Sequence, residues 1–296
     1  MTYSCLHTHT SFCDGAADVE TMCRAAFEKG FDSLGFSSHA PLTRKTGIKT
    51  NWHLSDERLD EYISTVLEAR KNWEGKLAVY LGLEVDYIEG LSGPANPDIQ
   101  NLPLDYIIGA VHYVRVPKNG ELFTVDGPDE EFCRGLEGFD NDGMALSAAY
   151  YTAYNNMIRG GNCDILAHLD LVKKNNDRFG FLSPSDFRYK KMLTETADTI
   201  AAARSADSER NPVVEVNTGG INRGRTADPY PSLDGLRLLK ERNIPLVITA
   251  DAHAPDHLGG HYETAVKTME NAGYRTMLLF TGRQDGKAGW QEVPLE

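Results

Sequence analysis

No stretch of the sequence approaches 18 uninterrupted apolar residues, the length at which a run becomes a candidate membrane span, so no membrane partner is expected. The first residues, MTYSCLHTHT, also lack the charged and long apolar segments of a secretory signal peptide. The five cysteines are scattered and never spaced C-x-x-C (Cys5, Cys13, Cys23, Cys133 and Cys163). This usage is typical of reduced thiols and predicts a cytoplasmic protein.

Positive charge is scarce as well. The chain has 30 Lys and Arg against 43 Asp and Glu, a formal net charge of -13. Nucleic-acid grooves depend on clustered Lys and Arg, so no nucleic-acid partner is expected. The 296 residues are 41% hydrophobic, enough for a large core. We predict a single domain over residues 1–296.

Short strand-like segments alternate with helical patterns along the chain. The pattern after the first segment begins with Asp18 as a possible N-cap and closes on Gly30, and that over 54–75 carries an apolar stripe. Such alternation predicts βα units and a parallel sheet. The seven segments are YSCLHTHT, SLGFSSHA, LAVYLGLEVDY, DYIIGAVHYV, CDILAHLDL, PVVEVNTGG and PLVITADAH.

No glycine-rich dinucleotide fingerprint follows the first segment. This absence favours an α/β fold with a closed or nearly closed barrel over an open doubly wound sheet. An eighth apolar run, YRTMLLFTG (274–282), either closes the barrel or lies outside it. The sequence leaves both alternatives open.

Potential metal ligands stand at the ends of six of these segments. In a (β/α) barrel the carboxyl ends of the strands converge on one face, which carries the chemistry. Six of the nine histidines occupy such positions, whereas His53, His257 and His261 do not and are expected at the surface or behind the ligands. The candidates are His7, His9, His39, Glu84, His112, His168, Asp251 and His253, with Asp14 in the loop after the first segment.

The types of ligand narrow the choice of metal. Imidazoles mixed with carboxylates, without paired cysteines, suit zinc, iron or manganese. Nine side chains exceed the needs of one ion, so two to three divalent transition-metal ions are expected. Glu84 is a natural bridge because its carboxylate offers two oxygens. Ions about 3.5–4 Å apart can hold a hydroxide and stabilise the attacking and leaving oxygens of a displacement.

Six motifs carry a resemblance to a known family: HTHTSFCDG, SSHAP, GLEVDY, GAVHY, AHLDL and DAH. In this order they resemble the PHP (polymerase and histidinol phosphatase) family, and within it the stand-alone histidinol phosphatases of histidine biosynthesis. The resemblance covers essentially the whole chain. It implies a distorted seven-stranded, TIM-like barrel with a trinuclear metal site formed by the nine candidates above. Some relatives have a histidine where Asp14 stands, so the metal preference at that ion stays open.

The resemblance also implies a reaction, the hydrolysis of L-histidinol phosphate to L-histidinol and phosphate. A hydroxide that bridges two ions would attack phosphorus in line, and no C-x5-R or D-x-D-x-T signature of a covalent phosphatase is present. Asp251 and His39 are the catalytic candidates. The alternatives are another phosphoesterase of the family acting on nucleotides or small phosphate esters, an amidohydrolase, or a non-catalytic module like those attached to DNA polymerases.

Two loops are candidates for contact with the substrate. The first, NTGGINRGRTADPYP, follows the sixth segment and offers Asn217 and Arg223; Lys173, after the fifth motif, is a similar candidate. The second, 116–143, is too long for a simple βα connection and predicts a lid or wall whose acidic residues suit a cationic substrate. A solvated surface loop is the alternative for both.

Overall fold

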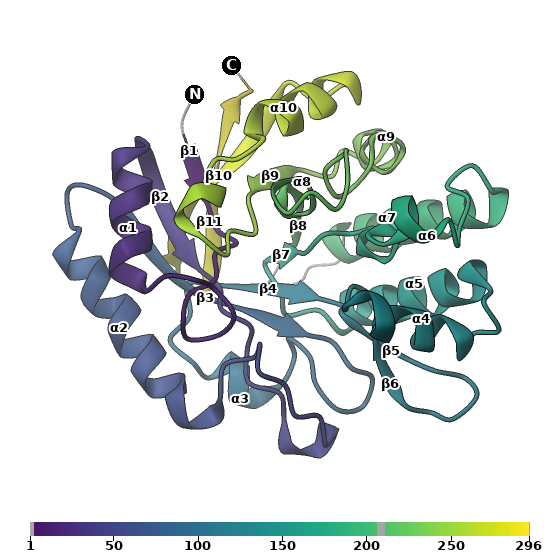
Figure 1. Ribbon diagram of the computed structural model, residues 1–296. Coiled ribbons are helices and arrows are strands. Elements are labelled where there is room, and N and C mark those ends of the chain that lie inside the picture. The colour runs from purple at the N-terminus through teal and green to yellow at the C-terminus, as the bar shows by residue number, and fades with distance from the viewer. Residues whose placement is uncertain (1–2, 206–210, 296) are drawn as a thin grey trace.

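A nearly closed barrel of seven parallel strands forms the centre of the molecule (Figure 1). The computed structural model describes residues 3–205 and 211–295. Beyond the first and last strands, Thr8 forms a parallel bridge with Ala252, which brings the two edges of the sheet together. The predicted barrel is therefore confirmed. In spatial order the strands are β1 (Tyr3–Cys5), β2 (Phe31–Phe36), β3 (Ala78–Asp86), β4 (Tyr106–Ala110), β7 (Ile165–Leu166), β8 (Val213–Asn217) and β9 (Leu246–Thr249).

Helices connect the strands and cover the outside of the barrel (Figure 1). The first begins where the sequence predicts, because the Asp18 side chain accepts a hydrogen bond from the Thr21 amide at 2.8 Å. Gly30 follows its end with a φ of +77°, a value that favours glycine. The longer helices are α1 (Val19–Glu28), α2 (Leu59–Asn72), α5 (Gly143–Gly160), α7 (Phe187–Ser205), α9 (Leu233–Glu241) and α10 (Tyr262–Asn271), and the shorter ones are α3 (Pro97–Gln100), α4 (Asp129–Glu137), α6 (Asn176–Phe179) and α8 (Gly219–Asn222).

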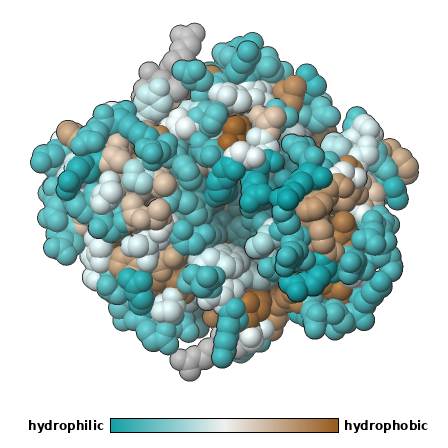
Figure 2. Space-filling view, in the orientation of Figure 1, coloured by the Kyte–Doolittle hydropathy of each residue, from teal (hydrophilic) through white to brown (hydrophobic). Residues whose placement is uncertain are grey.

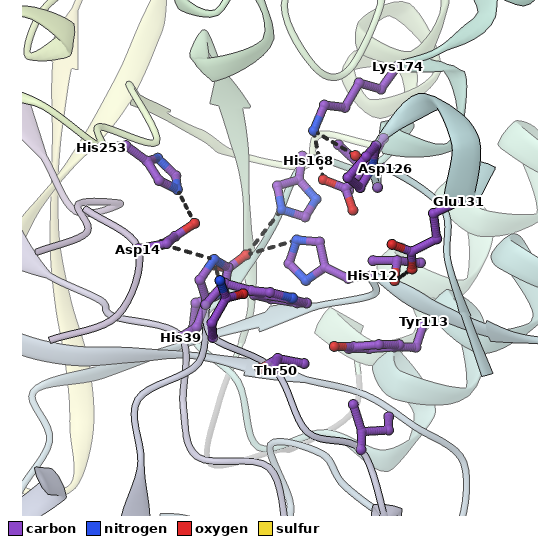
Figure 3. A pocket seen from close by; sticks show the side chains of 18 of the residues that line it. Asp14, His39, Thr50, His112, Tyr113, Asp126, Glu131, His168, Lys174 and His253 are labelled. Atoms are coloured by element: carbon purple, nitrogen blue, oxygen red, sulfur yellow. Dashed lines mark hydrogen bonds and ion pairs between the residues drawn. The ribbon is translucent and has the colours of Figure 1, made fainter. Parts of the chain in front are cut away.

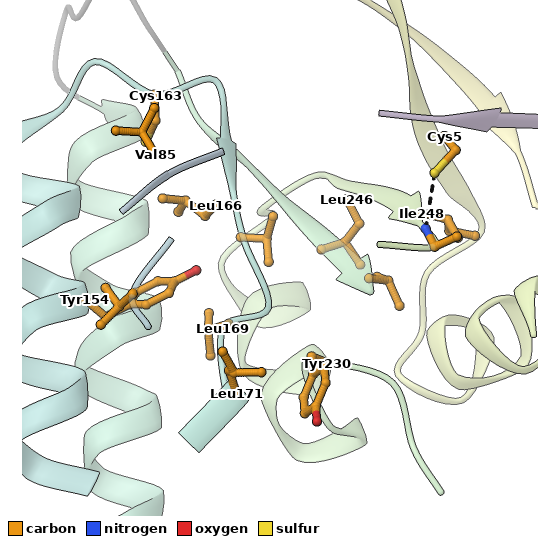
Figure 4. Packing of buried hydrophobic residues seen from close by; sticks show 14 of the residues in the cluster. Cys5, Val85, Tyr154, Cys163, Leu166, Leu169, Leu171, Tyr230, Leu246 and Ile248 are labelled. Carbon is orange, nitrogen blue, oxygen red and sulfur yellow. Dashed lines mark hydrogen bonds between the residues drawn. The ribbon is translucent and has the colours of Figure 1, made fainter. Parts of the chain in front are cut away.

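The outer faces of the strands pack against these helices through apolar side chains. Figure 4 shows Leu166 of β7, Leu246 and Ile248 of β9 and Tyr154 of α5 in one cluster of buried residues. The Tyr154 hydroxyl donates to the carbonyl of Ala167 at 2.5 Å, so the helix is tied directly to the end of β7. In the described part of the chain, no helix combines the length and apolarity that crossing a bilayer requires.

One tyrosine lies in the interior of the barrel among other buried apolar side chains. Tyr106 is fully buried, and its hydroxyl donates to the carbonyls of Leu6 at 2.5 Å and Phe36 at 3.1 Å. The ring lies against Gly35 and Gly82, where a Cβ atom would approach it to within 2.4 and 2.5 Å. These two glycines make room for the ring, and the ring leaves no pore through the barrel.

The eighth apolar run lies outside the barrel. It forms β10 (Thr276–Gln284), which pairs antiparallel with β11 (Lys287–Pro294) as a separate two-stranded sheet. Phe280 packs on Tyr106 and Tyr80, while Arg283 pairs with Asp164, the residue before β7. The hairpin therefore closes the amino-terminal end of the barrel and leaves the carboxyl end to the site.

The long segment 116–143 is folded. It follows β5 (Tyr113–Arg115) and contains β6 (Leu122–Thr124), which pairs with β5, and then α4. Phe123 and Phe132 join β6 to α4 through buried rings 6.0 Å apart. The segment is thus held by a small core of its own beside the barrel mouth.

Candidate metal centre

The nine predicted ligands meet at the carboxyl ends of the strands. His7, His9 and Asp14 follow β1, His39 follows β2, Glu84 is in β3, and the other four follow β4, β7 and β9. All except Asp14 and His253 have 6% or less of their surface exposed. Parallel strands bring their ends to one edge, so residues far apart in the sequence become neighbours, as the bridge between Thr8 and Ala252, 244 positions apart, illustrates.

Glu84 lies at the centre of the ligands. Its Oε2 is 2.9 Å from His39 Nδ1 and 3.1 Å from His7 Nε2. Its Oε1 is 3.1 Å from His168 Nε2 and 3.7 Å from His112 Nε2. The two oxygens therefore face different sets of imidazoles, which is the arrangement required of a carboxylate that bridges two ions.

The remaining ligands extend the centre on the other side of Glu84. His9 Nε2 is 3.3 Å from Asp251 Oδ1, and His253 Nε2 is 3.2 Å from Asp14 Oδ2 (Figure 3). Ligand atoms within 4.8 Å of one another form three groups that use predicted ligands alone: His7, His9 and Asp251; Glu84, His112 and His168; and His9, Asp14, His39 and His253.

Several buried ligand atoms face one another without forming a hydrogen bond, which fits a site that binds metal. In the described part of the chain, Nε2 of His7, Nε2 of His9, Nδ1 of His39 and Oε2 of Glu84 are buried without a hydrogen bond. Leaving such atoms unpaired costs about 1–3 kcal/mol each. Imidazole nitrogens and carboxylate oxygens at one point fit divalent transition metals.

A fourth group contains His39, Asp86 and His112. In this group Asp86 supports the ligand His112 through a hydrogen bond. Asp86 Oδ1 accepts from His112 Nδ1 at 2.8 Å, and its Oδ2 accepts from His53 Nε2 at 2.9 Å. Both oxygens of Asp86 are therefore engaged. Its contact with His112 Nδ1 fixes the tautomer that presents Nε2 to the centre.

Glu215 supports the centre in the same way. Its Oε2 accepts from His7 Nδ1 at 2.9 Å, and its Oε1 accepts from the His168 amide at 2.8 Å. The sequence analysis did not single out Glu215 or Asp86. The signal was alternation along a strand, which places Asp86 on the same face as Glu84 and Glu215 on the same face as Asn217.

The charges at the centre perturb one another strongly. Burial lowers the pKa of His7, but Glu215, Glu84 and Asp251 outweigh burial and raise it well above the usual value. Burial also lowers the pKa of His112, yet Asp86 and Glu84 raise it to about 10. His9, which faces His253 and His39, has its pKa lowered by burial and by these neighbours to about 3.

Glu84 and Asp251 respond in the opposite direction. Burial favours their neutral forms, but His7 and His39 hold the pKa of Glu84 well below its usual range. Arg223 and His7 do the same for the pKa of Asp251. Both carboxylates are thus ionised at neutral pH and available as ligands.

A cavity of about 590 Å³ opens above the ligands. Figure 2 shows the hollow in the middle of this face, bordered by hydrophilic residues. Its floor contains Glu84, His112 and His168, and Trp52 and Tyr113 form an aromatic wall. A volume of this size is typical of pockets for small molecules.

The three predicted substrate contacts have different positions. Arg223 lines the cavity, and its Nη2 is 3.0 Å from Asp251 Oδ2. Asn217 is buried beneath the cavity, where its side-chain amide donates to Glu215 at 2.7 Å. Lys173 is not among the lining residues, because its ammonium pairs with buried Asp170 at 2.9 Å.

The lysine that reaches the cavity is the next one along the chain. Lys174 lines it and pairs with Asp126 Oδ2 at 2.8 Å (Figure 3). Lys173 is the last residue of η3 (Leu171–Lys173) and Lys174 follows it, and this short helical turn sends consecutive side chains in different directions. The position of Lys173 after the fifth motif could not show which of the two lysines lines the cavity.

Segment 116–143 forms one wall of the cavity through Leu122, Thr124, Asp126, Gly127, Pro128 and Glu131. Two of its acidic residues are paired within the protein, Asp126 with Lys174 and Asp129 with Arg178. Burial, together with Asp86, Asp126 and Glu131, raises the pKa of Tyr113, so its hydroxyl stays protonated beside these carboxylates.

The three histidines outside the motifs lie around the centre. His53 has a buried side chain and contacts Asp86, and His257 Nδ1 accepts from the His253 amide at 3.3 Å. His261 is exposed. None of the three belongs to a ligand group of the described residues.

Comparison with known proteins agrees with this geometry. A model of the PHP domain matches residues 6–219, which contain seven of the nine ligands. The chain belongs to the PHP family. Both the family and the barrel that the motifs predicted are therefore confirmed.

Similar PHP proteins extend over nearly the whole chain. It is 31% identical to a "Probable histidinol-phosphatase" of Deinococcus radiodurans, with 92% of this chain and 94% of that one covered. It is 25% identical to the histidinol-phosphatase of Bacillus subtilis, with 87% and 96% covered. The fold matches histidinol phosphate phosphatase of Lactococcus lactis, solved with zinc, L-histidinol and phosphate, at a TM-score of 0.70, 16% identity and coverage of 97% and 99%.

Proposed function

We propose that the chain is a metal-dependent phosphomonoesterase that hydrolyses L-histidinol phosphate to L-histidinol and phosphate in histidine biosynthesis. The observation that carries the proposal is the convergence of three ligand groups on Glu84 at the floor of a cavity suited to a small molecule. The names of its PHP relatives support the choice of substrate. The five free cysteines and the net charge of -13 support a cytoplasmic enzyme without a nucleic-acid partner.

Two to three divalent ions, of zinc, iron or manganese, would be held by the three ligand groups, with Glu84 shared between ions. The zinc in the Lactococcus lactis protein supports the first of these metals. When bound, such ions neutralise phosphate charge and make water a stronger nucleophile at neutral pH. The orphaned nitrogens of His7, His9 and His39 are the atoms that would bind them.

The residues around the ions bind and orient the phosphate ester. Arg223, which pairs with Asp251, and Lys174, which pairs with Asp126, both line the cavity, so together they present two cations to a phosphate dianion. Asp251 keeps Oδ1 toward His7 and His9 and Oδ2 toward Arg223, which fixes the orientation of its carboxylate.

Water attacks phosphorus in line with the leaving oxygen, the P–O bond to that oxygen breaks, the proton released by the water passes to the leaving oxygen, and no residue is phosphorylated. We assign Asp251 to guide the proton of the attacking water, with its low pKa making it a weak acceptor. His39 remains a second candidate for proton transfer, although its Nδ1 faces Glu84 and its Nε2 faces Asp14. This placement favours a ligand role for His39.

The test compares kcat/KM for L-histidinol phosphate with that for p-nitrophenyl phosphate. We expect a much larger value for L-histidinol phosphate, because contacts with its remote groups position the phosphate for attack. Comparable values would remove the specific substrate and leave a phosphoesterase of broader range. Elemental analysis should find two to three metal ions per chain, and activity that persists after complete metal removal would contradict the mechanism.

A further inference from the structure

The aromatic wall of the cavity leads away from the metal centre. Trp52 lies against the ligand His39, with ring centroids 4.7 Å apart, and stacks on Tyr113 at 5.7 Å with an angle of 12° between the planes. Trp52 and Tyr113 both line the cavity. A phosphate ester with its phosphate at the ions would therefore place its organic part along these rings.

Tyr113 offers an unused polar atom in this wall. The residue is 5% exposed, and its hydroxyl has no hydrogen-bond partner in the described part of the chain. Figure 3 shows the hydroxyl turned toward the interior of the cavity. A buried hydroxyl without a partner is costly, so it points to a ligand group that completes its hydrogen bonding.

Glu131 offers an unused charge beside that hydroxyl. Its Oε1 accepts from the Thr124 hydroxyl at 2.8 Å, and no cation forms an ion pair with it among residues 3–205 and 211–295. Its neighbours Asp126 and Asp129 are neutralised by Lys174 and Arg178. Glu131 is therefore the carboxylate of this wall that is left to attract a cation from the substrate.

We propose that Tyr113 and Glu131, together with the face of Trp52, form the subsite that selects phosphate esters whose organic part carries a cationic nitrogen. The carboxylate and the hydroxyl accept hydrogen bonds from N–H groups, and an aromatic face attracts cations and stacks on flat rings. This inference rests on the proposed function only in placing the phosphate at the metal centre. The amine and the imidazole of L-histidinol phosphate both match the subsite.

The experiment uses the metal-loaded enzyme and two small esters that differ in charge. Ethanolamine phosphate ends in an ammonium where propyl phosphate ends in a methyl group. We expect Glu131→Gln to lower the ratio of their kcat/KM values by about 10- to 100-fold, the range for one charge-assisted hydrogen bond. Glu130→Gln, which changes an exposed neighbour, is the matched control and should leave the ratio unchanged.

Two further variants keep the test decisive if Glu131→Gln folds poorly. Tyr113→Phe should lower the preference for L-histidinol phosphate over propyl phosphate by about tenfold, because it removes one hydrogen-bonding group. Glu131→Lys should reverse the preference between ethanolamine phosphate and propyl phosphate. An unchanged ratio in all three variants, or an equal loss with both substrates, would overturn the subsite.

Failure of the subsite and failure of the proposed function give different results. Good turnover of L-histidinol phosphate with unchanged preferences in the variants rejects the subsite and keeps the function. Poor turnover of L-histidinol phosphate, combined with a preference for other cationic esters that Glu131→Gln abolishes, rejects the substrate and supports the subsite.

Discussion

The two ends of this barrel treat buried polar groups in opposite ways. At the amino end, Arg283 pairs with Asp164 and the Tyr106 hydroxyl donates to two carbonyls, so these polar groups have partners within the protein. At the carboxyl end, nitrogens of His7 and His9 and an oxygen of Glu84 are buried without hydrogen bonds. One end is complete as folded, whereas the other is complete only with ligands. This contrast indicates that the polar residues at the amino end stabilise the fold, whereas those at the carboxyl end serve the chemistry of the site.

Packing follows the same division. The hairpin of β10 and β11 seals the amino end with Phe280, which contacts Tyr80, Tyr106 and Trp290. The carboxyl end has the cavity instead of a plug. Changes at the two ends should therefore separate activity from the free energy of unfolding.

The largest effect is expected from Glu84→Gln. The substitution keeps the size of the side chain but removes the charge shared by two sets of imidazoles, and a lost contribution of several kcal/mol corresponds to a fall in kcat of about a thousandfold or more. The metal content should fall as well, as elemental analysis would show. His261→Ala, an exposed change, is the control. Near-normal kcat with full metal content would show that Glu84 does not bridge.

Phe280→Ala should show the reverse behaviour. Loss of a buried phenylalanine costs about 3–5 kcal/mol of the free energy of unfolding, which denaturant titration measures. The folded fraction should retain normal kcat/KM because the change is at the far end of the barrel. Thr281→Ala, exposed on the same strand, should be close to silent. A loss of activity without a loss of stability would break the division between the two ends.

Glu215→Gln should have an intermediate effect. Glu215 orients His7 without belonging to the ligand groups, and such supporting residues change metal affinity by about 10- to 100-fold. Metal titration of the variant would measure the weaker affinity, and excess metal should restore most of kcat. A defect that persists at full metal content would give Glu215 a direct part in the reaction.

Metal binding should also release protons. In the metal-free protein Glu215 and Glu84 raise the pKa of His7 despite burial, and Asp86 and Glu84 raise that of His112 to about 10. These imidazoles are charged at pH 7, so an ion that binds at Nε2 displaces a proton, and apparent affinity falls as the pH falls. Calorimetry in buffers of different ionisation enthalpy would count the protons; none released would contradict the charged state.

The raised pKa of His112 also makes the stability of the metal-free protein depend on pH. Because the folded-state pKa of His112 is raised, its contribution to the metal-free protein is fully present below about pH 6.5 and is lost as the pH rises toward 10. The melting temperature of metal-free protein should therefore decline over this range. Metal-loaded protein should not follow the decline, since bound metal replaces the proton.

Short patterns of neighbouring residues predicted several features of this protein correctly. The capping of α1 by Asp18 and the strand-end positions of His39 and His168 could be read from a few adjacent residues. The assignment of Lys173 in place of Lys174 to the cavity came from the same kind of reading. Successive residues of a 3₁₀ turn such as η3 are rotated by about 120°, so one position decides which lysine faces the cavity. The single domain over residues 1–296 stays a prediction.

The types of the candidate ligands and their grouping could be predicted from the sequence alone, because most of them follow strands and parallel strands end at one edge of a sheet. Only the tertiary structure decided which residues stand behind and beside them. Glu215 and Asp86 support His7 and His112 through hydrogen bonds across different strands, and Tyr113 and Glu131 meet because β5, β6 and α4 fold back over the barrel mouth. Alternation along the strands indicates the face on which Asp86 and Glu215 lie, but the side chains that they contact depend on strand register and helix rotation, which no local pattern of residues encodes.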